Sequence, residues 1–577
     1  MQEKMQEKIT KISADSPLPE LLAPAGSPEA LAAALRAGAD AVYLGSTQFG
    51  ARAFAKNFDR PALKQAVEDA HAAGVRVYLT VNTLITDRMM RAAMDLVAYA
   101  YEVGVDALIV ADWGLAKLCR ENYPDFPLHA STQCSGHNAD AARWLADHGF
   151  SMMVAARELS ADNLRKLIKD SPIPIEVFVH GALCVSASGQ CLFSSLVGGR
   201  SGNRGECAQP CRMQYNNKTP LSLKDLSLAM HIPQLIEMGV ASLKIEGRMK
   251  SPDYVYRVVS IYRRLLDERR TATPSEMRAL EEAFSRQGFT DGYFVGNTAD
   301  MNGVRSEADK SATAKAAGGL KQHTQVRKEP LPPIVLPQRT PHAPTLPPLP
   351  KKAKEVIKPS ARFYKPDTIP AEHKLEVVYL PLEKFDGKVA NGVLLPPIIP
   401  DGELEKVEKA LSRAKDAGAK HVMVGNVGQI ALAKRSGLTV HGDFRLNLQN
   451  SYAAEVFADF ADLLLSPELL LAQMRDIPAK KAAIVYGRVP LMLLEKSCGT
   501  TRLTDRMKKN FPVITEGGRE LVLNSLPIYM ADKQDLLSPV GVGYHYVFTQ
   551  EGPQEVKVTL SSYDRSLPTK KEVRRIK

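Results

Sequence analysis

The stretch ELLAPAGSPEALAAALRAGADAVYLG, residues 20–45, decides the fold that the sequence predicts. A short apolar run is followed by an amphipathic segment and then by a second apolar run, AVYLG, which is rich in β-forming residues. Ser27 can cap a helix, Pro28 suits its first position, and Gly38 can end it. The stretch therefore predicts one strand–helix–strand unit.

The same alternation continues from Pro19 to about Gly247. It contains eight predicted strands: ELLAPA, AVYLG, VRVYLTVN, ALIVAD, PLHAST, MMVAAR, EVFVHG and SLKIEG. Eight strands that alternate with helices predict a (β/α)8 TIM-like barrel within an α/β protein, with a doubly wound open sheet as the alternative. In such a barrel the functional side chains gather at the C-terminal ends of the strands.

The composition divides the 577 residues into four predicted parts. A charged N-terminal tail covers residues 1–17, and the barrel covers 18–300. Nine prolines among residues 330–350 predict an extended, semi-rigid linker over 301–372. Residues 373–577 are predicted to form a second α/β unit with a basic C-terminal tail.

The second unit carries an internal repeat of the first. VGNVGQIALAKRSGLTVHGDFRLNLQNS (424–451) follows the scheme of residues 110–139, and LLLSPEL (463–469) matches VAAREL (154–159). AAIVYGRVPLMLLEKSC (482–498) matches EVFVHGALCVSASGQC, with Pro490 in the place of Cys184. The sequence thus predicts a diverged, partial copy that supports folding or substrate binding rather than chemistry.

Charge and hydropathy indicate the setting of the protein. A formal net charge of +11 favours anionic partners, although part of the excess lies in the linker and the tail, where a solvated charge run is the alternative. No run of 18 apolar residues is present, and the N-terminus is charged where a signal peptide would be apolar. We therefore expect a cytoplasmic protein without membrane contact.

Four of the seven cysteines, Cys184, Cys191, Cys207 and Cys211, lie close together in the sequence. Thiolates are soft ligands for iron–sulfur clusters or zinc. The spacing C-x6-C-x15-C-x3-C lacks the C-x2-C pairs of a zinc ribbon, so a [4Fe–4S] cluster is favoured over zinc, with free thiols or a disulfide as the alternative. Cys119 is predicted to lie in the core, while Cys134 is either a spare ligand or a free thiol.

Other polar residues follow the predicted strands and the cysteine-rich segment. The predicted catalytic residues are His180, Glu246 and Arg248, and the predicted substrate-binding residues are Arg157, Arg200, Asn203, Arg204 and Lys244. His180 can act as an acid or base, or can be a hydrogen-bonded structural residue. Lys244 and Glu246 share one strand face, which predicts an ion pair directed into the barrel mouth. The glycine-rich segment VGGRSGNRGEC suits an anion, with a solvated loop as the alternative.

These motifs resemble the peptidase U32 family, the collagenase-like proteases. The resemblance rests on residues 20–45, EVFVHGALCVSASGQCLFSS, RGECAQPCR and LKIEGRMKSPDYVYRVV. It implies three kinds of activity: collagenase-like peptidase activity, hydroxylation of tRNA or 23S rRNA pyrimidines that depends on iron–sulfur assembly and prephenate, and oxygen-independent ubiquinone hydroxylation with a [4Fe–4S] cluster on four cysteines. The resemblance also implies that the four clustered cysteines are ligands, with Cys134 as a substitute for one of them, and that prephenate is a co-substrate.

Among these functions the sequence favours RNA hydroxylation, with RNA as the partner. The cysteines, the basic charge and the arginine-rich segment fit that activity together, whereas the hydrolase signatures HExxH and GxSxG and the Walker A motif are absent. The alternative is a peptidase that acts on collagen or another peptide. A third interpretation makes the cysteines a structural staple in a scaffold that binds RNA or protein.

Overall fold

The computed structural model describes residues 16–318, 324–327, 329–336, 339–349 and 356–563. Its first half is a closed barrel of eight parallel strands, because β9 pairs with both β1 and β7. The strands are β1 (Glu20–Ala25), β2 (Ala41–Gly45), β3 (Arg76–Val81), β4 (Ala107–Val110), β5 (Leu128–Ala130), β6 (Met152–Val154), β7 (Ile175–Gly181) and β9 (Ser242–Ile245). The predicted TIM-like barrel is confirmed, and its strands are the eight that the sequence indicated.

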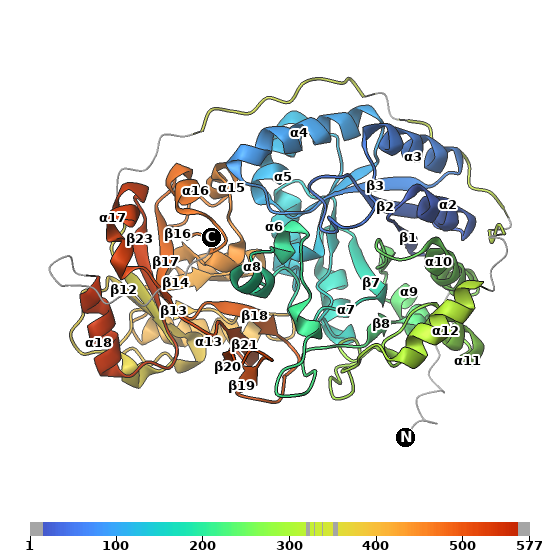
Figure 1. Ribbon diagram of the computed structural model, residues 1–577. Helices are drawn as coiled ribbons and strands as arrows, with labels where there is room; N and C mark the ends of the chain where they lie inside the picture. Colours follow the sequence, from blue (N-terminus) through green and yellow to red (C-terminus); the bar gives the residue numbers. More distant parts are fainter. Residues whose placement is uncertain (1–15, 319–323, 328, 337–338, 350–355, 564–577) are drawn as a thin grey trace.

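Helices surround this ring (Figure 1). They are α2 (Pro28–Arg36), α3 (Arg60–Ala72), α4 (Asp87–Glu102), α5 (Trp113–Asn122), α6 (Ala139–Asp147), α7 (Ala161–Asp170), α9 (Ile232–Glu237) and α10 (Pro252–Asp267). The first helix begins as the sequence predicts: the Ser27 hydroxyl accepts from Ala30 N at 3.2 Å, and Pro28 takes the first turn. Two short strands, β8 (Asp225–Ser227) and β10 (Phe289–Thr290), extend the sheet beyond β7, and α11 (Pro274–Ala283) and α12 (Glu307–Gly318) follow.

The second half is a second closed ring of eight parallel strands, because β23 pairs with both β11 and β17. Its strands are β11 (Ser360–Phe363), β12 (Val377–Pro381), β13 (Gly392–Leu394), β14 (His421–Val424), β15 (Thr439–Gly442), β16 (Leu463–Leu464), β17 (Lys481–Gly487) and β23 (Gly543–Phe548). Its main helices are α13 (Leu404–Asp416), α14 (Ile430–Ser436), α15 (Ser451–Val456), α16 (Leu471–Asp476) and α18 (Pro553–Ser562). The repeat is therefore more extensive than the sequence indicated, and its first strand lies within the predicted linker.

The two rings share fine details of backbone geometry. Both β7 and β17 change register against a neighbouring strand, the first between Phe178 and His180 and the second between Ile484 and Tyr486. Both strands then end in a glycine with positive φ, +107° at Gly181 and +117° at Gly487. A Cβ at either glycine would meet backbone at 2.6 Å or less, so only glycine fits. Tyr486 therefore occupies in the second ring the place that His180 has in the first.

The rings pack against each other through equivalent residues. Asn138 caps α6 and donates to Ile399 O at 2.8 Å across the interface, while Asn450 caps α15 and donates to Ile85 O at 2.9 Å. Each asparagine side chain lies against a glycine of the other ring, because a Cβ at Gly428 or Gly114 would lie within 2.3 Å of its Oδ1. The interface thus has approximate two-fold symmetry, as two copies of one unit would produce.

An antiparallel sheet follows β17 and lies between the rings (Figure 1). It comprises β18 (Pro490–Leu494), β19 (Arg502–Thr504), β20 (Asn510–Glu516) and β21 (Arg519–Leu523) in the order β18-β21-β20-β19. The segment after β7 pairs with β18, since Ala187 N donates to Leu493 O and Leu192 N to Leu491 O, each at 2.7 Å. Apolar residues from both segments form one buried cluster. The two segments that follow the equivalent strands β7 and β17 therefore pack on each other.

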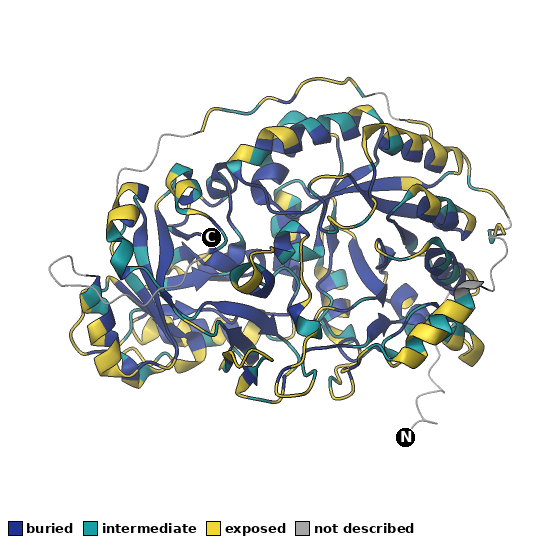
Figure 2. Cartoon of the chain, viewed as in Figure 1, coloured by how far each residue is buried: buried dark blue, intermediate teal, exposed yellow. Residues whose placement is uncertain are grey.

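The described parts of the proline-rich segment 324–349, which we call the strap, cross the outside of the first barrel (Figure 1). The strap meets the C-terminal ends of α2, α3, α4 and α5 in turn. Val326 N donates to Arg36 O at 2.9 Å, Ile334 N to His71 O at 3.0 Å, and Arg339 Nη1 to Val105 O at 2.7 Å. Figure 2 shows much of its outer side exposed. The strap is extended, as the prolines predicted, and its described parts are held by hydrogen bonds to backbone carbonyls at or just after these helix ends.

The part of the chain that the structure describes contains no helix long and apolar enough to cross a membrane.

Candidate functional site

The mouth of the first barrel is organised around Glu246, directly after β9. Arg52 donates to one oxygen of this carboxylate from Nε at 3.2 Å and from Nη2 at 3.0 Å. The predicted ion pair between Lys244 and Glu246 is wrong, because Lys244 Nζ contacts Glu176 Oε1 at 2.7 Å. The two side chains share a strand face, as expected, but Lys244 pairs with Glu176 on the adjacent strand β7, and Glu246 pairs with Arg52 in the loop after β2.

Glu246 is ionised in this setting. Burial alone would raise the pKa of its carboxyl group, but the charges of Arg52, Arg157 and Arg248 outweigh burial and lower that pKa to about 2. The group is therefore an acceptor near neutral pH and has no proton to give. Three cations around one carboxylate also leave the mouth with excess positive charge.

Arg248 is the most enclosed of these cations, with 4% of its surface exposed. Its Nη1 donates to Thr80 Oγ1 at 2.9 Å, and among the described residues no carboxylate forms an ion pair with it. A Cβ on Gly45 would lie 2.3 Å from Nη1, so this glycine makes room for the guanidinium. Burial and the charge of Arg52 lower the pKa of Arg248 to about 10. Arg248 is thus a buried cation that an anionic ligand would stabilise.

Arg157 lies at the same mouth. Its guanidinium covers the Phe178 ring at 3.9 Å from the ring centre, and Nη1 donates to Ala182 O at 3.3 Å. Its Nε is buried without a hydrogen-bond partner among the described residues. Arg157 and Arg248 are therefore two predicted mouth residues that keep unused donor capacity.

The arginine-rich segment lies across the mouth. Asn203 O accepts from Leu84 N at 3.2 Å, and Gly205 O accepts from Ala53 N at 3.4 Å. Arg200 is exposed and lies over the Phe54 ring, whereas Arg204 is partly buried with an unpaired Nε. The structure thus brings Asn203 and Arg204 to the mouth and leaves Arg200 at its solvent edge.

His180 lies outside this group. It is 1% exposed, its Nδ1 is 3.3 Å from the Tyr262 hydroxyl on α10, and its ring packs edge-on against Phe289. Burial lowers the pKa of His180 to about 3, so the ring is neutral over the physiological range. These contacts include none of the other predicted site residues, and they match the structural alternative that the sequence left open for His180.

The four clustered cysteines lie in the loop that follows β7, residues 182–212, here called the cysteine loop. Cys184 and Cys207 are exposed, Cys191 and Cys211 are partly buried, and all four are free thiols. Burial raises the pKa of Cys191 well above its usual value, and the neighbouring thiolates of the other three cysteines raise it further. The four thiols are therefore within electrostatic range of one another.

The thiols do not form a ready site for a single ion. Across the described residues, no three His, Cys, Asp or Glu side chains are grouped closely enough to hold one metal ion. Cys119 is fully buried in the core, which confirms its predicted place. Cys134 is also buried, its pKa is raised by burial, and its thiol points at Val110 O at 3.6 Å. Cys134 thus has a hydrogen-bonded place outside the cysteine loop.

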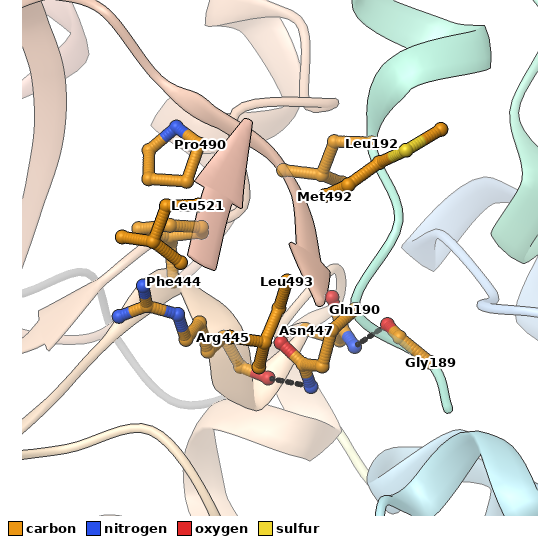
Figure 3. Close-up of a pocket in the computed structure, with 10 residues that line it drawn as sticks. All are labelled: Gly189, Gln190, Leu192, Phe444, Arg445, Asn447, Pro490, Met492, Leu493 and Leu521. Carbon is orange, nitrogen blue, oxygen red and sulfur yellow. Dashed lines mark hydrogen bonds between the residues drawn. The ribbon is translucent and has the colours of Figure 1, made fainter. Parts of the chain in front are cut away.

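A small recess lies at the seam between the cysteine loop and the second ring (Figure 3). Gln190 donates to Arg445 O at 3.3 Å and Asn447 Nδ2 donates to Gly189 O at 3.1 Å across it. The recess has space for little more than one water molecule. The two hydrogen bonds across the recess join the two halves of the protein, and the recess is too small for a substrate.

Sequence reasoning missed Arg52 and two polar residues within β2 and β3, Tyr43 and Thr80. The Tyr43 hydroxyl donates to Ile245 O at 2.9 Å, and Thr80 accepts from Arg248. The available signal was the position of Thr80 near the C-terminal end of its predicted strand, whereas Tyr43 lies mid-strand and Arg52 lies in the long loop after β2.

The barrel, the arginine-rich mouth and the adjacent cysteine loop define the class of protein: a TIM-barrel protein with several arginines at its mouth, beside a group of thiols. The sequence model described as peptidase family U32 matches residues 26–302. A tRNA hydroxylation protein P of Helicobacter pylori (strain ATCC 700392 / 26695) is 36% identical over 301 residues, which cover 48% of this chain and 71% of that protein. The chain therefore belongs to peptidase family U32.

Relatives with three kinds of names share this half of the chain. The 23S rRNA 5-hydroxycytidine C2501 synthase of Escherichia coli (strain K12) is 40% identical over 290 residues, 48% of this chain and 43% of that protein. The tRNA hydroxylation protein P1 of Bacillus subtilis (strain 168) is 39% identical, covering 43% of this chain and 63% of that protein. A protein named collagenase from Porphyromonas gingivalis (strain ATCC BAA-308 / W83) is 35% identical, covering 48% of this chain and 73% of that protein. The chain thus matches less than two thirds of the length of the first two.

Among solved structures, a U32 peptidase has a TM-score of 0.26 and 16% identity over 29% of this chain and 70% of its own.

Proposed function

We propose that the protein is an iron–sulfur-dependent enzyme that hydroxylates a pyrimidine base in tRNA or rRNA, and that it acts in the cytoplasm. The observation that carries the proposal is the family match over residues 26–302, since this range contains the whole mouth and all four clustered cysteines. Relatives named for tRNA hydroxylation and for 23S rRNA 5-hydroxycytidine synthesis are 30–40% identical to the chain. The identities support an RNA substrate.

The donor set supports an iron–sulfur cluster more than a zinc ion. The clustered cysteines are free thiols, which are soft ligands: Cys184, Cys191, Cys207 and Cys211. Their charges would influence one another, but among the described residues no three of them are grouped closely enough to hold a single metal ion. Thiolates that hold a four-iron cluster lie farther apart than those around a single zinc ion, so this arrangement suits the larger group. A bound cluster would supply electron-transfer chemistry at this edge of the mouth.

The chain's own residues would bind and orient the substrate. Arg157 and Arg248 have donors free to hold a phosphate or carboxylate group, and Glu246 keeps Arg52 in place. Prephenate, which the family resemblance implies as a co-substrate, carries carboxylates that would suit these guanidinium groups. A target base would have to leave its stack to reach the mouth.

An exposed basic hairpin supports RNA as the partner. Arg502, Arg506, Lys508 and Lys509 lie exposed on or beside β19 and β20, and Asp505 holds the turn by accepting from Lys509 N at 2.8 Å. Asn216, just beyond the cysteine loop, accepts from Thr504 N at 2.9 Å and thereby joins the hairpin to that loop. The positive charge of this hairpin would attract the phosphates of an RNA bound near the cysteine loop.

Two measurements test the proposal. Anaerobic purification followed by iron, sulfide and zinc analysis should give iron and sulfide together, with a cluster absorption band. Nucleoside mass spectrometry of rRNA and tRNA from a deletion strain should show one hydroxylated pyrimidine missing, and the wild-type gene should restore it. Stoichiometric zinc without iron or sulfide would reject the cluster.

The second candidate is a collagenase-like peptidase, which the name of the Porphyromonas gingivalis relative favours. This activity would need a nucleophile or an activated water at the mouth, and four thiolates on one zinc ion would leave no open position for water. An unchanged nucleoside profile, together with collagen cleavage that disappears in Glu246→Gln, would select the peptidase. The third interpretation, a structural staple, would be selected if both activities were absent and cysteine substitution only unfolded the loop.

A further inference from the structure

Two matching polar pairs occupy equivalent places in the two rings. In the first ring, His137 Nε2 lies 2.7 Å from Glu158 Oε1. In the second ring, Gln449 Nε2 donates to Glu468 Oε2 at 3.0 Å. His137 and Gln449 each precede the asparagine that caps α6 or α15, and each glutamate stands four residues beyond the end of β6 or β16. The pairs are therefore the same feature in two copies.

Both glutamates bind the cysteine loop, one from each side. Glu158 accepts from Ser188 N at 3.0 Å and from its hydroxyl at 3.1 Å. Glu468 accepts from the Ser201 hydroxyl at 2.7 Å and from Asn203 Nδ2 at 3.5 Å. The cysteine loop belongs to the first barrel by sequence, yet part of its polar anchoring comes from the second ring.

The portion that Glu468 holds is the portion that lies across the mouth. Asn203 and Gly205 accept from backbone amides of the loops that follow β3 and β2. A Cβ on Gly205 would lie 2.6 Å from Gly50 O, so the two backbones are in close contact. Cys207, one of the four clustered thiols, follows two residues after Gly205. The segment 201–207 therefore links Glu468 to both the thiols and the arginine-rich mouth.

We propose that Glu468, oriented by Gln449, is a positioning residue that fixes segment 201–207 over the mouth of the first barrel. The second ring has lost the cysteines, and this contact gives it a role in the reaction: it supplies one of two equivalent anchors for the loop that carries them. The inference rests on the proposed function only where activity or iron release is measured, since loop position can be observed without either.

The test uses the full chain with Glu468→Gln, with Glu455→Gln as the matched control. Glu455 also reaches from the second ring to the first, because its carboxylate contacts Lys117 Nζ at 3.1 Å, but it does not touch the cysteine loop. Hydrogen–deuterium exchange should rise about tenfold in peptides covering 201–207 of Glu468→Gln, which corresponds to the loss of about one charge-assisted hydrogen bond. Glu455→Gln should leave those peptides unchanged.

Two further readouts separate positioning from simple loss of stability. Ser201→Ala should also raise hydrogen–deuterium exchange in peptides covering 201–207. The double variant Ser201→Ala with Glu468→Gln should raise this exchange, expressed as a free energy, by less than the sum of the two single effects, because both substitutions remove the same hydrogen bond. Iron release to a chelator should also be faster in Glu468→Gln, at an unchanged melting temperature. Equal exchange of 201–207 in Glu468→Gln and Glu455→Gln would overturn the proposal.

The outcomes keep the two proposals distinct. If the purified protein contains no iron and the nucleoside profile is unchanged, but exchange of 201–207 still rises in Glu468→Gln, the positioning role stands and the proposed function fails. If hydroxylation is confirmed but exchange does not change, the positioning role fails alone.

Discussion

The mouths of the two rings contrast in how their buried charges are balanced. In the second ring, Arg362 is fully buried, and its Nη2 donates to Asp443 at 2.5 Å. Arg445 completes the network by donating to Asp443 at 3.0 Å and to Glu516 at 3.1 Å. In the first ring, one carboxylate, Glu246, faces three arginines. In the mouth of the second ring the buried charges pair with one another, whereas the mouth of the first ring has an excess of positive charge.

The difference shows how a repeated fold can separate stability from binding. Two cations and two carboxylates satisfy each other in the second ring, and the inserted strand β20 supplies one of the carboxylates. The first ring leaves Arg248 with a neutral hydroxyl as its partner. We expect substitutions in the two mouths to differ in sign and size accordingly.

The largest effect should come from Arg362→Leu. Removal of this guanidinium leaves Asp443 with one cation in a buried site and should cost about 3 to 5 kcal/mol in the free energy of unfolding. Urea titration followed by circular dichroism measures it, with the exposed Arg506→Leu as the control. A loss below about 1 kcal/mol would contradict the view that the second mouth is held closed by its ion pairs.

The next effect concerns acid stability. The folded pKa of Glu246, about 2, lies below its ordinary value of 4.5, so the carboxylate stabilises the protein above the higher value and loses this contribution as the pH falls towards the lower one. Wild type should therefore lose about 3 kcal/mol more than Glu246→Gln between pH 5 and pH 2. Parallel acid titrations, with urea unfolding where the fold persists, measure the difference. Equal losses would mean that the arginines do not hold this carboxylate ionised.

Arg248→Leu should leave the free energy of unfolding unchanged or raise it, because a buried cation without an acidic partner carries a desolvation cost that a leucine side chain avoids. The same substitution should nevertheless abolish most of the RNA modification, since it removes a guanidinium available for an anion. Chemical denaturation and nucleoside mass spectrometry of a complemented deletion strain give the two values. A stability loss as large as that of Arg362→Leu would erase the contrast between the mouths.

The smallest effect should arise outside both mouths. Lys508→Gln with Lys509→Gln should lower RNA affinity severalfold at low salt and reduce the slope of log affinity against log salt by roughly 1 for each phosphate that the lysines no longer neutralise. Fluorescence anisotropy with a labelled RNA fragment measures both quantities. Lys409→Gln on the exposed helix α13 is the matched control. An unchanged slope would remove the hairpin from the RNA-binding surface.

Much of the fold could be predicted because it depends on local patterns. Apolar runs and caps located all eight strands of the first ring, and the repeat located the strands from β14 to β17 in the second. Closure of the second ring could not be seen in advance, since β16 has two residues and β23 returns only after the inserted sheet. Closure depends on pairing between distant segments, which periodicity does not encode.

The site was predictable in position but not in pairing. The sequence placed Lys244, Glu246 and Arg248 at one end of the barrel, because the ends of parallel strands meet there. It could not assign Lys244 to Glu176 or Glu246 to Arg52, since these contacts depend on which strands become neighbours. The hydrogen bond between Glu468 and Ser201 joins one ring to the other, and residues so far apart in the chain cannot be paired from the spacing of a local motif.

The strap has a consequence for how this chain can vary. Arg327 and Arg339 bind at the ends of α2 and α4, and Pro347 O then accepts from Tyr452 of the second ring at 3.0 Å. These contacts occur in the same order as the residues in the chain, so the length of the strap is matched to the distance that it spans from α2 to the second ring. Its composition can change freely between contacts, but a residue added or removed shifts every later contact out of phase with its helix. We therefore expect the length of this proline-rich segment to matter more than its sequence.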